Sequence, residues 1–160
     1  MYESLILFAC LILTALTASE TPWSKGSGCD DPNGFSVVEA ADAEAHYVKI
    51  VRGDEVLHTI KTPTGANWNG FALDEAKKTR EGFEISIEYG SRFYYHKTFI
   101  FVCRRHKFYL SKIMVDSFDK FHPQKGTERV VRVRPNLPLE KFAITDFMRE
   151  GVVQHRSKQR

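Results

Sequence analysis

The residues best suited to chemistry are Cys103 and His106, which lie three positions apart in the sequence Cys-Arg-Arg-His. A histidine can activate a cysteine as a nucleophile, because the imidazole accepts the thiol proton. These two residues are expected on opposite sides of a strand end and its turn, where proton transfer between them would require distortion. Cys29 is a partner for a disulfide with Cys103, and that bond would consume the thiol. We therefore expect a structural disulfide between Cys29 and Cys103 rather than a catalytic cysteine.

Metal and acid–base chemistry find little support in the sequence. A zinc site needs three or four ligands, whereas Cys103 and His106 supply two, and no further CxxC or HxxxH pair occurs. Glu84 and Glu88 lie on one face of an expected strand, about 13 Å apart. Carboxylates that hydrolyse a glycosidic bond stand about 5 to 10 Å apart. We expect no enzyme, no cofactor and no metal site.

A cationic cluster is the feature that rises above the background of the sequence. Four basic residues occupy consecutive positions 104–107, between two apolar runs that predict a rigid hairpin. Two further arginines lie on the polar face of a later strand. The candidate partner-binding residues are Arg104, Arg105, His106, Lys107, Arg132 and Arg134. Such a tip could engage an acidic cleft through electrostatic steering, or it could serve solubility alone.

A second candidate site surrounds the only tryptophan expected in a loop of the domain. Asn67, Trp68 and Asn69 follow one another in a stretch rich in turn-forming residues. An indole ring can stack on a sugar while neighbouring amides bind its hydroxyl groups, although a tryptophan in a loop also commonly packs against the edge of a core. This group is the alternative sugar-binding site.

The elements that must position these residues are mostly strands. Residues 93–115 predict a β-hairpin at the centre of a sheet, with the basic tetrapeptide as its turn. Residues 83–89 alternate apolar and polar side chains, which is typical of a strand with one solvated face. Residues 47–51 and 55–60 predict a second hairpin, closed by a tight turn at Gly53.

The remaining segments complete the expected fold. Residues 71–81 predict a helix, because they contain helix formers with acids early, bases late and a glycine directly afterwards. Residues 117–126 are expected to form a loop whose two phenylalanines fold back onto the core. Residues 128–134 predict a strand that Pro135 and Pro138 end. About seven strands at hairpin spacing with one short helix predict a mainly β fold, either an antiparallel β-sandwich or an open barrel.

The N-terminus carries features of an exported protein. Residues 4–18 contain no charged side chain and are too short for a membrane-spanning helix, although no Lys or Arg precedes them. We expect residues 1–19 to be a signal peptide that is removed, and residues 20–160 to form one compact domain with a flexible basic tail over 154–160. An alternative is lipidation at Cys10, which follows a leucine, a phenylalanine and an alanine. Either route predicts a periplasmic or secreted protein.

Charge and architecture together favour a binding function. The formal net charge of +3 is modest and does not indicate a nucleic-acid-binding protein. We also expect no stable membrane insertion of the mature domain. Export, a disulfide-pinned domain and the absence of a catalytic constellation suggest an inhibitor or immunity protein that neutralises a secreted toxin or wall-degrading hydrolase with an acidic surface. A carbohydrate-binding or adhesive β-sandwich module is the alternative function.

Overall fold

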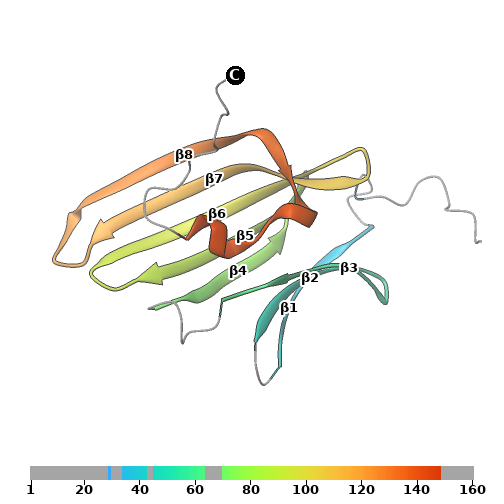
Figure 1. The fold of residues 1–160 in the computed structure, drawn as a ribbon, viewed down its shortest axis with the longest axis horizontal. Helices are drawn as coiled ribbons and strands as arrows, with labels where there is room; N and C mark the ends of the chain where they lie inside the picture. The colour runs from blue at the N-terminus through green and yellow to red at the C-terminus, as the bar shows by residue number, and fades with distance from the viewer. Residues whose placement is uncertain (1–28, 30–33, 43–44, 64–69, 149–160) are drawn as a thin grey trace, which may run out of the picture.

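The computed structural model describes residues 29, 34–42, 45–63 and 70–148. These residues form two antiparallel sheets, one of three strands and one of five, each in sequence order (Figure 1). The three-stranded sheet comprises β1 (Ser36–Ala41), β2 (His46–Arg52) and β3 (Glu55–Lys61). The five-stranded sheet comprises β4 (Ala72–Lys78), β5 (Gly82–Gly90), β6 (Phe93–Arg104), β7 (Lys107–Asp119) and β8 (His122–Pro138). The predicted mainly β fold and β-sandwich are confirmed.

The core lies between the inner faces of the two sheets. Strand β5 buries the alternating residues Phe83, Ile85, Ile87 and Tyr89, as its sequence pattern predicts. The largest fully buried side chains in the described ranges are Phe83, Phe99, Phe101, Ile50, Ile85, Ile87, Leu110, Ile113, Ile144, Met148, Val48 and Val133. Because residues from both sheets join one apolar cluster, neither sheet can keep its inner face dry without the other.

Two short 3-10 helices, η1 (Leu139–Lys141) and η2 (Ile144–Phe147), follow the last strand. Figure 1 shows this segment passing across the face of the five-stranded sheet. The ring of Phe142 packs edge-on against Phe99 and Phe101, with ring centroids 5.2 and 5.0 Å apart. The segment therefore completes the cover of the inner face beside the three-stranded sheet.

The predicted helix over residues 71–81 is wrong, because this segment forms strand β4. A bulge between Leu73 and Glu75 adds one residue to the strand, so that Leu73 and Ala76 both pack against the core three positions apart. That spacing imitates the period of a helix. The edge of β4 is also tied to the other sheet, since the Glu39 carboxylate accepts the Ala76 N–H at 2.9 Å. Tertiary contacts thus override the helical propensity of this segment.

The predicted loop over residues 117–126 is also wrong. Strand β7 continues to Asp119, and β8 begins at His122 after a two-residue turn. Phe121 in that turn is 74% exposed instead of folding back onto the core. Strand β8 also runs past Pro135 to Pro138. It is the edge strand of its sheet, so no further strand needs the backbone N–H that a proline lacks.

Cys29 and Cys103 form the predicted disulfide, with their Cα atoms 5.6 Å apart. No helix among the described residues is both long and apolar enough to cross a bilayer. The predicted signal peptide over residues 1–19, with Cys10, and the predicted tail over 154–160 lie outside the described residues.

Candidate functional site

The basic tip, which we define as residues 104–107, is the turn between β6 and β7. Arg104 pairs with Lys107 across the hairpin, and Arg105 and His106 form the turn itself. All four side chains are exposed. Arg105 and His106 have φ values of 50° and 64°, as the central residues of a type I′ turn require. Most natural turns of this kind use Asn and Gly, because bulky residues are strained in the left-handed region.

Covalent and packing contacts hold the base of the basic tip. Cys103 carries the disulfide to Cys29, and its N–H donates to the Glu81 carbonyl at 2.8 Å. Phe108, the residue after the tip, packs edge-on against Phe35 and Phe83, with ring centroids 4.9 and 5.0 Å apart. The tip is therefore presented from a rigid base, and the disulfide leaves Cys103 no thiol with which to act as a nucleophile.

Arg132 and Arg134 lie on the outer face of β8 rather than at the tip. Both are exposed, with buried Val133 between them. Arg132 pairs with Lys112 of β7, five residues from Lys107, which is about 17 Å along an extended strand. These arginines and Lys112, which the sequence pattern did not single out, make a basic flank separate from the tip.

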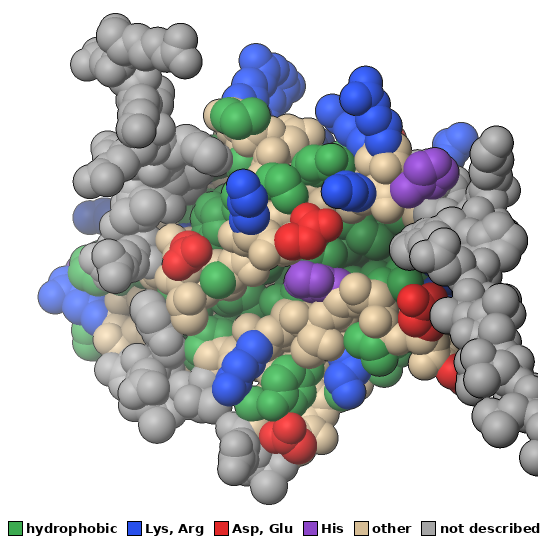
Figure 2. Space-filling model, turned by 45° about the vertical axis from the view of Figure 1, so that its right-hand side comes forward, with side chains coloured by type: hydrophobic (Ala, Val, Ile, Leu, Met, Phe, Trp, Pro, Cys, Tyr) green, Lys and Arg blue, Asp and Glu red, His purple; other side chains and the backbone are tan. Residues whose placement is uncertain are grey.

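Figure 2 shows a face on which Lys and Arg side chains are interspersed with acidic and apolar side chains. The basic residues of this face do not merge into one continuous area. Asn67, Trp68 and Asn69, the alternative sugar-binding residues, lie outside the described residues.

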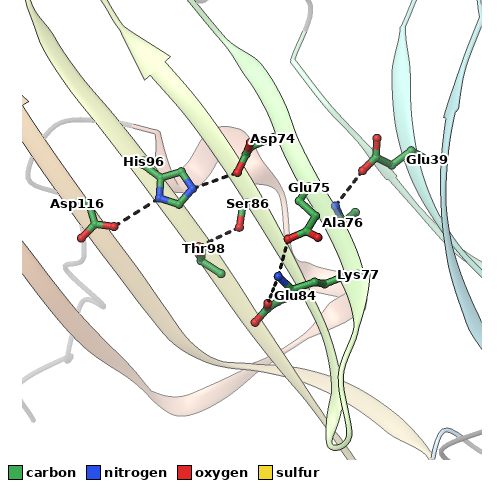
Figure 3. Close-up of polar contacts among 10 residues, drawn as sticks. All are labelled: Glu39, Asp74, Glu75, Ala76, Lys77, Glu84, Ser86, His96, Thr98 and Asp116. Carbon is green, nitrogen blue, oxygen red and sulfur yellow. Dashed lines mark hydrogen bonds and ion pairs between the residues drawn. The ribbon is translucent and has the colours of Figure 1, made fainter.

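A histidine–carboxylate cluster on the outer face of the five-stranded sheet was missed by sequence reasoning. The His96 ring lies between two aspartates, with Nε2 3.4 Å from Asp74 and Nδ1 3.4 Å from Asp116 (Figure 3). Glu88 pairs directly with His96 on the neighbouring strand. Residues 74, 88, 96 and 116 are far apart in the sequence, and only the register of four strands and the bulge at Asp74 brings them together. Alternation within each strand predicts only that these side chains lie on the solvated face, and not that they lie close together.

The chemistry open to this cluster is limited. Asp74, Glu88 and His96 each offer a ligand atom, and these atoms lie within 4.8 Å of one another, which is the ligand count of an open divalent-metal site. The same contacts are also those of a histidine bridging two aspartates in an exposed ionic network. Glu84, the other acid of β5, is paired with Lys77 at 3.1 Å. The geometry therefore assigns neither a metal nor a pair of catalytic carboxylates.

Lys97 is a buried cation that the sequence pattern did not single out. Its side chain lies on the inner face, 4% exposed, and its ammonium donates to the Phe147 carbonyl at the end of η2. The stacked rings of Tyr89 and Tyr95 lie beside the ammonium, with centroids 5.3 and 5.9 Å away. Burial, with a smaller contribution from Arg129, lowers the pKa of Lys97 to about 8. Because its partner is a main-chain carbonyl, this lysine fastens η2 to the sheet.

The chain matches no known protein family, no curated protein and no solved structure. The described residues therefore carry the evidence for function through their chemistry and geometry.

Proposed function

We propose that this chain is an extracytoplasmic β-sandwich binding protein whose basic tip engages an acidic surface of another protein. The observation that carries this proposal is the left-handed conformation of Arg105 and His106. Each such residue costs about 1 to 2 kcal/mol relative to glycine in the same conformation. A chain that keeps an arginine and a histidine in this conformation gives up stability, as strained residues at recognition sites commonly do.

Rigidity makes the basic tip suitable for recognition. The disulfide at Cys103 and the packing of Phe108 fix the strands that carry the four side chains, so less conformational entropy is lost on binding than for a flexible loop. The disulfide also supports a location outside the cytoplasm, where such bonds persist. The specific role that we propose is inhibition of, or immunity to, a secreted toxin or wall-degrading hydrolase with an acidic cleft.

Exposed charges of this kind act mainly on association. We expect the basic tip to raise the association rate with an acidic partner, and we expect this advantage to decline as salt concentration increases. Reversing Arg104, Arg105 and Lys107 to glutamate should therefore slow association strongly while leaving the fold intact, because none of these side chains is buried.

The test is affinity capture with purified protein from the secreted and envelope fractions of the encoding organism. The expected result is one acidic partner in stoichiometric amount, captured by the wild-type protein and lost with R104E/R105E/K107E. The matched control is K61E/R80E/K141E, which reverses three other exposed cations and gives the same change in net charge. Equal capture of the partner by the tip variant and the control would refute the proposal.

A further inference from the structure

Among the described residues, the end of the five-stranded sheet opposite the basic tip is not covered by the other sheet. Strands β6 to β8 extend past β1 to β3 on the side of the β7–β8 turn (Figure 1). Two turns meet there, since the Lys120 N–H donates to the Arg92 carbonyl at 3.0 Å. Phe93, the first residue of β6, follows one turn and is 49% exposed, while Phe121 lies in the other and is 74% exposed. We define this aromatic end by Arg92, Phe93, Lys120, Phe121 and Lys125.

The two phenylalanines are held in place by a cation. The Arg92 guanidinium lies over both rings, 5.4 Å from the centroid of Phe93 and 5.6 Å from that of Phe121. The same guanidinium is paired with Asp119 at 3.2 Å, and Asp119 also accepts the Phe121 N–H at 3.0 Å. The backbone hydrogen bond from Phe121, with help from Arg92, lowers the pKa of Asp119. These contacts therefore fix the orientation of the two exposed rings.

Positive charge dominates around these rings. The Asp119 carboxylate is compensated by Arg92, whereas Lys120 and Lys125 are exposed on the turn and on the first residues of β8. Lys120 also lies over the Tyr94 ring, 5.3 Å from its centroid. A hollow of about 360 Å³ borders the turn, and the aromatic side chains of Phe93, Tyr95 and Phe118 line it together with Lys125, His122 and Asp119. Because Arg92 already pairs with the Asp119 carboxylate, the lining offers aromatic surface beside the Lys125 ammonium, which suits an anionic group attached to an apolar body.

We propose that the aromatic end docks on the surface of an anionic lipid bilayer. Phe121 projects from the apex of a convex turn, so it can enter the boundary between headgroups and acyl chains while the flanking cations meet anionic headgroups. A protein partner would need pockets shaped to both rings and to the guanidinium that lies over them. A fluid interface accommodates both rings without such pockets. This contact is peripheral, and it leaves the opposite, basic tip free for its own partner.

The test places a fluorescent reporter at the aromatic end. Full-length F121W is mixed with vesicles of phosphatidylcholine alone or of phosphatidylcholine with phosphatidylglycerol, and the wild-type spectrum is subtracted to remove the two native tryptophans. The expected result is an emission shift to shorter wavelength, with quenching by brominated lipid, only for the anionic vesicles. The matched control is V56W, at an exposed apolar position on β3, which should show neither change even if the N-terminal apolar segment binds lipid.

Charge removal supplies the second measurement. Replacing Lys120 and Lys125 by glutamine in the F121W protein should lower its affinity for the anionic vesicles about 25-fold. Each cation contributes roughly a factor of five to that affinity. Identical spectra of F121W with and without vesicles would overturn the proposal. A shift produced by soluble polyglutamate and not by vesicles would also overturn it and would assign the aromatic end to an acidic peptide. Neither result depends on the basic tip, which lies about 36 Å away along β6.

Discussion

Lys97 shows how one side chain can make the stability of this protein depend on pH. Its position between Tyr95 and Phe99 places it on the inner face of β6, in register with buried Ile87 and Val115. An ammonium at that depth is less favourable than in water, which is why its pKa falls from 10.5 to about 8. Below pH 8 the amine is charged in both the folded and unfolded states, so the cost of burying it is constant.

We predict that the free energy of unfolding rises as the pH increases from 8 to 10. In this window the unfolded chain binds more protons at Lys97 than the folded chain does, so the free energy of unfolding increases with pH. The total increase between the folded and the unfolded pKa of Lys97 is at most about 3 kcal/mol. Above pH 10 the rise is opposed by Tyr94, because burial first and Glu88 second raise its pKa to about 12. Urea unfolding at successive pH values measures the effect.

K97M should abolish this rise, whereas K112M, which removes an exposed lysine of the neighbouring strand, should retain it. If K97M and the wild-type protein showed the same slope, titration of Lys97 would not be its cause.

At the scale of single elements, we expect substitutions in the turn of the β6–β7 hairpin to raise stability and weaken binding together. R105N/H106G installs the residues that a type I′ turn prefers, so we expect the free energy of unfolding to increase by about 1 to 2 kcal/mol. The same substitutions should weaken binding of the acidic partner, because two basic side chains are lost. Chemical denaturation and partner titration measure the two effects. R105A/H106A, which removes the same side chains but keeps the strained backbone, should lose affinity without gaining stability; an equal gain in both variants would contradict the strain argument.

The same elements show what the sequence could and could not predict. Regular alternation correctly placed Phe83, Ile85, Ile87 and Tyr89 in the core, because a period of two follows directly from strand geometry. Alternation failed at β4, where the bulge at Asp74 changes the period locally. Alternation also could not predict that Asp74, Glu88 and His96 lie together, because cross-strand neighbours depend on register, which no single segment encodes. The basic tip was predictable because all four of its residues are consecutive.

At the scale of the whole molecule, the pairing of the two sheets depends on contacts that are distant in the sequence. The edge of β1 meets the edge of β4 through Glu39, and Lys78 donates to the Phe35 carbonyl at 2.7 Å. Residues 139–148 return to cover Phe99 and Phe101. The disulfide was predictable from Cys29 and Cys103 together with the expected signal peptide, but the sequence could not predict these noncovalent links. The disulfide is the covalent one among these long-range constraints, and it joins Cys29 to the base of the basic tip.

Removing this bond with C29A/C103A should lower the free energy of unfolding by about 4.5 kcal/mol, since the disulfide closes a loop with a sequence separation of 74 residues in the unfolded chain. That loss is a large fraction of the 5 to 15 kcal/mol typical of a domain. Urea unfolding of the variant and of the wild-type protein measures this loss. Amide hydrogen exchange reports on the base of the basic tip, at Cys103 in the wild-type protein and at Phe108 in both proteins. F35A is the informative comparison, because it removes the ring that packs on Phe108 but keeps the bond. If C29A/C103A lost less than about 1 kcal/mol while F35A lost more, noncovalent packing rather than the disulfide would be what holds the N-terminal segment against the hairpin.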